Sequence, residues 1–259
     1  MSLFLLSATM GLQPPRRAET ADAGPLLQVY LLGLVEFEAA LALQRLLVYH
    51  VAGDRDRAAL VLCEHPPLIT VGRQGSRGHI LCDADELKAR RWSVRWVNRG
   101  GGCLLHLPGQ LAVYPILALD RLGLGLRAYL DRLEAVLADV LADFQIPCQT
   151  RPGQAGLWVG SRPIATIGVA VRDWVTYFGA ALNVNPDLGP FRLVRCGGPE
   201  DGPMTSLERE RRGPLRPSLV RERLLEHFAA RFGFDRTALF FGHPALGRMT
   251  PSDAVTAGR

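Results

Sequence analysis

Three short β-rich runs in the second half of the chain most constrain its fold. Residues 156–159, 163–171 and 175–184 are rich in apolar and β-branched side chains, and only Gly-Ser-Arg and Arg-Asp turns separate them. Strands joined by connections this short pair antiparallel, because a parallel crossover needs a dozen or more residues. The spacing therefore predicts a meander of antiparallel strands.

Helical patterns alternate with strand patterns along the rest of the chain. Apolar residues recur every three or four positions over 126–141, which predicts an amphipathic helix of about five turns packed on the sheet. Further helices are expected at 36–50 and 219–232, and further strands at 26–32, 58–63, 94–97 and 110–117. We expect a single α/β domain whose sheet is mostly antiparallel or mixed and is packed with helices.

The composition limits the classes of protein to which the chain can belong. A chain of 259 residues, 48% hydrophobic and 21% charged, is typical of one large domain. We assign it to residues 26–242, with 1–25 as a disordered leader and 243–259 as a flexible tail. The apolar start lacks a preceding charged region, and no stretch is long enough to span a membrane. We expect no membrane association and a cytoplasmic location.

Charge and cysteine content exclude other classes. The net charge is +5, but the basic residues are scattered, so we expect no nucleic-acid partner and favour an acidic protein partner. The five cysteines are an odd number without CxxC spacing, which indicates neither a disulfide framework nor a metal site.

One of these cysteines is a candidate nucleophile. Cys196 precedes two glycines and follows a turn-forming segment at 186–190. Inert structural cysteines prefer apolar surroundings, so a thiol in this polar setting is a candidate acyl carrier. The alternative is a half-buried structural cysteine beside a tight turn.

A glycine run upstream supports the first interpretation. Arg99-Gly100-Gly101-Gly102 precedes His106 and lets the backbone pass close to a ligand. Together with Cys196, this run resembles the bacterial octanoyltransferase family over roughly residues 26–240. Other matching segments are Leu32-Gly33-Leu34-Val35, Glu64-His65-Pro66-Pro67, Gly72-Arg73, Gly156-Leu157-Trp158-Val159-Gly160, Ile164-Ala165-Thr166-Ile167-Gly168 and Leu182-Asn183-Val184-Asn185.

The resemblance implies a fold, a reaction and partners. The fold is that of biotin and lipoate protein ligases. The reaction moves octanoate from octanoyl-acyl carrier protein through a Cys196 thioester to a lysine of lipoyl domains, those of 2-oxoacid dehydrogenase complexes and the glycine cleavage H protein. The resemblance also implies a monomer and a reaction that needs no cofactor or metal.

The resemblance also implies where the acyl chain binds. It would lie along the glycine run and the following strand, then beside two further segments. These substrate-binding residues are Arg99, Gly100, Gly101, Gly102, Cys103, Leu104, Leu105, His106, Thr166, Ile167, Gly168, Gly179, Ala180 and Ala181. We expect a larger side chain at Ala180 to shorten the accepted acyl chain.

The chain departs from the family pattern near the thiol. Pro163 stands where the family has a lysine that assists the cysteine, and Phe178 and Leu107 replace a histidine and a glycine. Arg162 precedes Pro163, but successive side chains of a strand point to opposite faces, so Arg162 is expected to point away from Cys196. His106 is therefore the expected base. Two alternatives stay open: a paralogue that binds lipoyl domains or acyl carrier protein without transfer, and an ATP-dependent lipoate or biotin ligase.

Overall fold

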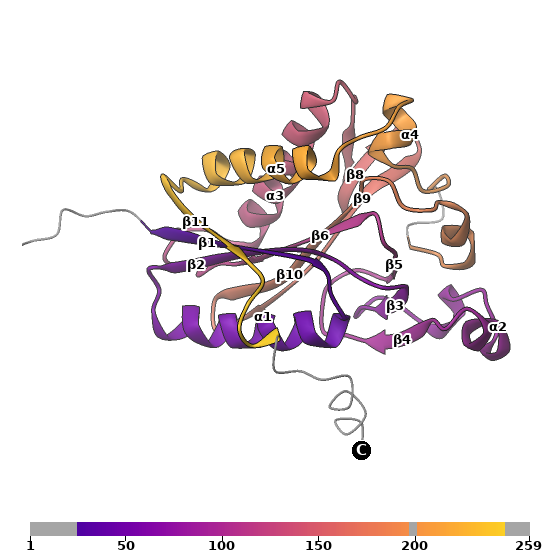
Figure 1. The fold of residues 1–259 in the computed structure, drawn as a ribbon, viewed down its shortest axis with the longest axis horizontal. Coiled ribbons are helices and arrows are strands. Elements are labelled where there is room, and N and C mark those ends of the chain that lie inside the picture. Colours follow the sequence, from indigo (N-terminus) through magenta and orange to yellow (C-terminus); the bar gives the residue numbers. More distant parts are fainter. Residues whose placement is uncertain (1–24, 197–200, 247–259) are drawn as a thin grey trace, which may run out of the picture.

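The fold is built on an eight-stranded mixed sheet with helices on both faces (Figure 1). The computed structural model describes residues 25–196 and 201–246. The strand order is β11-β1-β2-β6-β10-β9-β8-β7. Its members are β1 (Leu26–Leu34), β2 (Arg57–Glu64), β6 (Gln110–Ile116), β7 (Gln149–Arg151), β8 (Gln154–Val159), β9 (Arg162–Arg172), β10 (Val175–Asn183) and β11 (Arg236–Phe241).

The predicted meander is confirmed. Strands β8, β9 and β10 follow one another in the sheet and pair antiparallel, with Gly179 opposite Gly168 and Ala181 opposite Thr166. At the other side of the sheet β1 pairs parallel with both β2 and β11, so the sheet is mixed. The predicted fold class, a single α/β domain with a mixed sheet, is confirmed.

A second sheet of three strands was not predicted. It has the order β4-β3-β5, formed by β3 (Leu68–Val71), β4 (Ser93–Trp96) and β5 (Cys103–His106). The strands expected at 94–97 and 110–117, before and after the glycine run, correspond to β4 and β6. The run leads from β4 into β5, which was not predicted, and β6 belongs to the large sheet. β3 and β5 were missed because four residues give too short a pattern for periodicity to identify reliably.

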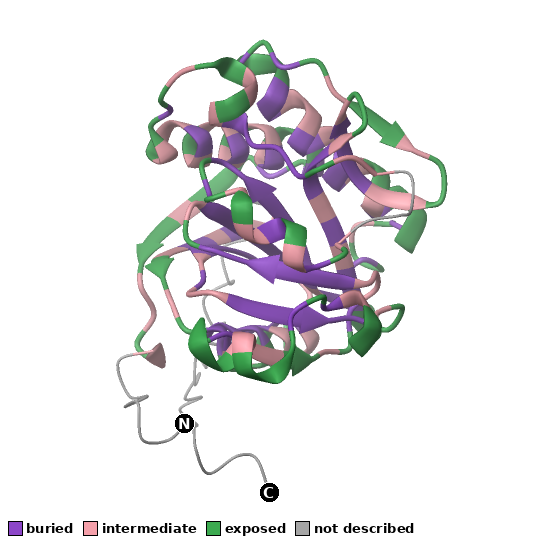
Figure 2. Ribbon diagram, turned by 90° about the vertical axis from the view of Figure 1, so that its right-hand side faces the viewer, coloured by how far each residue is buried: buried purple, intermediate pink, exposed green. Residues whose placement is uncertain are grey.

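Helices cover both faces of the large sheet. Helix α1 (Phe37–Gly53) packs on one face, and α3 (Leu126–Asp143) and α5 (Pro217–Phe232) pack on the other (Figure 1). Figure 2 shows buried residues concentrated on the strands between these helical layers. The main core cluster joins the sheet to α3 and α5 through residues such as Leu133, Leu137 and Phe228. The three long predicted helices are thus confirmed.

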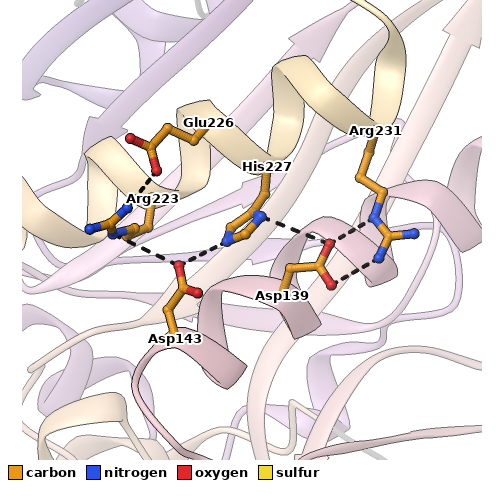
Figure 3. A network of polar contacts seen from close by, with 6 residues as sticks. All are labelled: Asp139, Asp143, Arg223, Glu226, His227 and Arg231. Carbon is orange, nitrogen blue, oxygen red and sulfur yellow. Dashed lines mark hydrogen bonds and ion pairs between the residues drawn. The ribbon is translucent and has the colours of Figure 1, made fainter.

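A row of charged side chains borders the contact between α3 and α5 (Figure 3). Arg231 Nε donates to Asp139 Oδ2 at 2.7 Å, and His227 Nε2 lies 2.8 Å from Asp143 Oδ2. Arg223 also approaches Asp143 and bonds Glu226. Exposed pairs of this kind contribute about 0–1 kcal/mol each, so burial of the apolar stripes dominates this contact.

The remaining elements are short and lie outside the expected pattern. They are α2 (Ala84–Ala89), α4 (Leu207–Arg211) and two 3-10 turns, Arg77–His79 and Gly189–Leu193. The predicted leader, apart from residue 25, lies outside the described residues, as do residues 247–259 of the predicted tail. The first tail residues are described, and Leu246 packs against the α1 side of the sheet. No helix in the described part of the chain is long and apolar enough to cross a membrane.

Candidate active site

A cavity of about 580 Å³ opens where the three-stranded sheet meets β8 and β9. The glycine run forms one wall, and the Gly100 amide donates to the Val169 carbonyl of β9 at 2.8 Å. Leu126 and Leu130 of α3 contribute apolar surface. The volume falls within the range of about 300–1,000 Å³ that is usual for small-molecule sites.

Gly168 allows the glycine run to approach β9 this closely. A Cβ atom at this position would lie 2.7 Å from the Gly100 carbonyl oxygen and 3.1 Å from Arg99 Cδ. Contacts this short are not tolerated between non-bonded atoms, so a side chain here would displace the run. The Ile-Gly pair of the sequence therefore shapes the cavity wall.

Cys196 lies on the wall of this cavity, and the chain is anchored on both sides of it. Upstream, the Arg195 amide donates to the His79 carbonyl at 2.8 Å, and Val194 forms a β-bridge with Ile80. Downstream, the Gly202 amide donates to the Ser161 carbonyl at 2.9 Å. Arg195, before the thiol, is thus bonded to the turn after β3, and Gly202, after it, is bonded to the hairpin between β8 and β9.

The thiol is protonated in this environment at neutral pH. Burial raises the pKa of Cys196 to about 12, while a backbone hydrogen bond from Leu105 and the nearby Arg99 guanidinium lower it only in part. A group with this pKa is ionised to only about one part in 10⁵ at pH 7. Thiolate chemistry at Cys196 therefore requires a proton acceptor.

Pro163 faces the same space as Cys196. Both residues line the 580 Å³ cavity and also a second cavity of about 650 Å³. Arg162 does not fill the gap, because its Nε and Nη2 donate to the two carboxylate oxygens of Glu210, each at 2.9 Å. The Arg162 guanidinium is therefore held by the Glu210 carboxylate of α4.

His106 lies in a buried hydrogen-bond network. Arg99 Nη2 donates to Thr70 Oγ1 at 2.8 Å, and Thr70 Oγ1 lies 3.1 Å from His106 Nε2. Burial, reinforced by His65 and Arg99, holds the pKa of His106 well below its usual range. The imidazole is therefore neutral.

A second set of buried hydrogen bonds connects β6 and β10 to the segment that follows Cys196. Gln110 Nε2 donates to Asn183 Oδ1 at 2.9 Å, and Asn183 Nδ2 donates to the Thr205 carbonyl at 3.0 Å. His106 lines only a small void of about 20 Å³ between the two sheets, not the cavity lined by Cys196. The structure therefore does not bring these two predicted catalytic residues together on one cavity wall.

The predicted substrate-binding residues fall into two groups. Those on the 580 Å³ cavity are Arg99, Gly100, Gly101, Gly102, Cys103, Leu104, Thr166, Ile167 and Gly168. Those on the small void, which shares some of these walls, are His106, Gly179, Ala180 and Ala181. Leu105 lines neither, and its side chain packs in the core beneath the three-stranded sheet.

Ala180 and Ala181 point to opposite faces of β10. Ala180 pairs with Ile167, and both side chains belong to the main core on the α3 side. Ala181 pairs with Thr166, and directly opposite residues share a face, so its side chain points between the two sheets. The residue that borders the void with its side chain is thus Ala181 rather than the expected Ala180.

Several residues of the site were missed from the sequence. His79 and Asp201 line both cavities beside Cys196, and Trp158 lines the 580 Å³ cavity. Trp158 Nε1 donates to Asp201 Oδ1 at 2.9 Å, and the Arg151 guanidinium stacks 5.1 Å over the Trp158 ring. No local pattern marks His79, because only the fold brings its turn to Cys196.

The structure thus places a half-buried thiol, Cys196, on the wall of a cavity within a mixed α/β fold. The lipoyl protein ligase A/B catalytic domain model matches residues 36–229. The octanoyltransferase of Geotalea uraniireducens is 41% identical over 76% of this chain and 89% of its own length. That of Geobacter metallireducens is 43% identical over 68% and 79%.

A solved structure supports the fold. A bi-partite lipoate protein ligase of Thermoplasma acidophilum superimposes with a TM-score of 0.62 at 18% identity, covering 86% of this chain and 89% of that one. The chain belongs to the octanoyltransferase family, and it is therefore an acyltransferase of protein lipoylation.

Proposed function

We propose that the chain takes an octanoyl group from octanoyl-acyl carrier protein onto Cys196 and passes it to a lysine amine of a lipoyl domain. Acceptors of this class are the lipoyl domains of 2-oxoacid dehydrogenase complexes and the glycine cleavage H protein. A thioester on Cys196 conserves the energy of the acyl bond between the two transfers. Neither step uses a metal or a nucleotide.

The presence of Cys196 on the walls of two cavities is the observation that carries this proposal. The 580 Å³ cavity has aliphatic walls from α3 and glycine walls that suit an alkyl chain. The 650 Å³ cavity offers a second approach to the same sulfur. A transferase needs both, because the acyl chain stays bound while the carrier leaves and the amine arrives. Burying the alkyl tail contributes about 0.8 kcal/mol per methylene.

Charge around these openings fits an acidic acyl carrier. Arg73, Arg192 and Arg195 are exposed and line the cavities. Opposite charge across an interface speeds encounter and orients the partners, an effect that weakens as salt rises. The phosphate of a phosphopantetheine arm would meet the same guanidinium groups.

Intact-mass spectrometry tests the proposal. The purified chain is incubated with octanoyl-acyl carrier protein, and in parallel with octanoate, ATP and magnesium. A mass increase of one octanoyl group on Cys196 with the carrier alone, followed by its transfer to a lipoyl domain, is the expected result. Acylation that needs ATP would identify a ligase, and binding without acylation would identify a carrier-binding paralogue.

Ala181→Leu is expected to shorten the accepted acyl chain. The void beside Ala181 is about 20 Å³ and shares Leu104 and Thr166 with the wall of the 580 Å³ cavity, so three added carbon atoms would fill the void and push these walls toward the acyl chain. Because one methylene in an apolar pocket is worth about 10- to 200-fold in selectivity, the kcat/KM ratio of octanoyl to butanoyl donors should fall at least about tenfold.

Ala180→Leu is the matched control. Its side chain enters the main core, so it should lower the free energy of unfolding by about 1–3 kcal/mol and leave the donor ratio unchanged. If a folded Ala181→Leu variant shows an unchanged donor ratio, the void is not part of the acyl-binding site.

Pro163→Lys is expected to raise the reactivity of Cys196 at neutral pH. The ammonium would enter a buried position on the same cavity walls as the thiol. A nearby opposite charge lowers a pKa by about 1–3 units, so iodoacetamide should alkylate Cys196 about tenfold faster at pH 7. Pro163→Met controls for the longer side chain, and equal alkylation rates in the two variants would contradict the prediction.

A further inference from the structure

His79 is held beside the nucleophile by backbone contacts. It ends the 3-10 turn Arg77–His79 between β3 and α2, and it is half-buried. Its carbonyl accepts from the amide of Arg195, the residue before Cys196, at 2.8 Å. Both His79 and Cys196 line the 580 Å³ cavity and the 650 Å³ cavity. His79 therefore lies on the walls of both cavities that Cys196 also lines.

Among the described residues, the other ionisable groups on these cavity walls are four arginines, Asp201 and Cys103. Arg73, Arg99, Arg192 and Arg195 remain protonated and have no acceptor capacity. The Asp201 carboxylate accepts hydrogen bonds from Arg151 and Trp158. Burial raises the pKa of the Cys103 thiol.

An imidazole differs from all of these groups, because it both accepts and returns a proton between pH 5 and 8. Among the described residues that line both cavities, His79 is the one histidine. The thiol, in contrast, is held in its protonated form by its buried position.

We propose that His79 is the general base of this site, a role that rests on the proposed transfer through Cys196. Its neutral ring takes the thiol proton as the sulfur attacks the thioester carbonyl of the acyl carrier. The carrier sulfur leaves as a thiolate and receives that proton from the imidazolium. In the second step the ring takes a proton from the attacking lysine amine. The Cys196 sulfur departs from the acyl carbon and is reprotonated by the ring.

The test compares His79→Gln and His79→Gly with the wild type and with His50→Gln, an exposed histidine on α1. Acylation of Cys196 by octanoyl-acyl carrier protein is followed by intact mass from pH 5.5 to 9. His79→Gln should acylate about 100-fold more slowly at pH 7, because general bases contribute about 10²- to 10⁴-fold. The pH profile of His79→Gln should differ in shape from the profile that the wild type and His50→Gln share.

Added imidazole provides a second readout that a merely structural role would not change. In His79→Gly it should restore acylation at pH 7 about tenfold or more, in proportion to the neutral imidazole present, and should leave the wild type unaffected. Wild-type rates and an unchanged pH profile in His79→Gln would overturn the assignment of His79 and leave acyl transfer intact. A wild type that is never acylated on Cys196 would instead overturn the proposed function and this inference with it.

Discussion

Cys196→Ser is expected to reduce octanoyl transfer to background, a loss of roughly 10³-fold or more. A serine hydroxyl is a far weaker acid than a thiol, and the buried position already disfavours the ionised form of the native thiol. The oxygen would therefore not attack the thioester at a useful rate. The measurement is transfer of octanoate to a lipoyl domain, together with the intact mass of the enzyme after exposure to the acyl carrier.

Two other cysteines provide matched controls. Cys148 is half-buried and lies outside both cavities, so Cys148→Ser should transfer at the wild-type rate. Cys103 lines the 580 Å³ cavity, but its thiol donates to the Ser76 carbonyl at 3.5 Å, and Cys103→Ser should retain acylation of Cys196. Full transfer by Cys196→Ser, or acyl mass that follows Cys103 instead, would end the Cys196 thioester mechanism.

Gly179→Ala is expected to destabilise the fold by about 3 kcal/mol, at the upper end of the usual cost of overpacking. A Cβ atom at this position would lie 2.1 Å from the Val113 carbonyl oxygen of β6 and 2.7 Å from Pro115 Cδ. Since the obstacle is backbone, β6 and β10 would have to separate. Urea unfolding followed by circular dichroism measures the effect.

Gly53→Ala is the control for this substitution. Gly53 ends α1, and a Cβ atom there would meet no heavy atom within 4 Å. Replacing a helical glycine by alanine typically stabilises a protein by about 0.4–1 kcal/mol, so the two variants should move the unfolding midpoint in opposite directions. If Gly179→Ala unfolds at the wild-type urea concentration, the close approach of β6 does not explain the glycine.

The close approach of β6 changes the role of Gly179, which was expected to help bind the acyl chain. Small residues at 179–181 were expected to leave room for an alkyl tail. The space beside Gly179 is taken by the backbone of β6, and Ala180 packs toward α3, so only the Ala181 side chain points between the sheets. The sequence shows that these three residues are small. It does not show that each is small because of a different neighbour in the folded structure.

Local patterns in the sequence determined the strand meander of β8, β9 and β10 and the helices α1, α3 and α5. Each of these elements is long enough to show a period of two or 3.6 residues, and the period records which face is buried. The turn residues between β8, β9 and β10 also specified antiparallel pairing. Cys196 and the glycine run were recognised by their unusual residue types alone.

Only the tertiary structure decided what surrounds the thiol. The turn that carries His79 and the strand that carries Pro163 meet Cys196 because the three-stranded sheet packs beside the large one. It also separated His106 from the thiol, by burying its ring against Thr70. Contacts between residues far apart in the chain depend on how whole layers pack, and periodicity within one element carries no information about its neighbour's side chains.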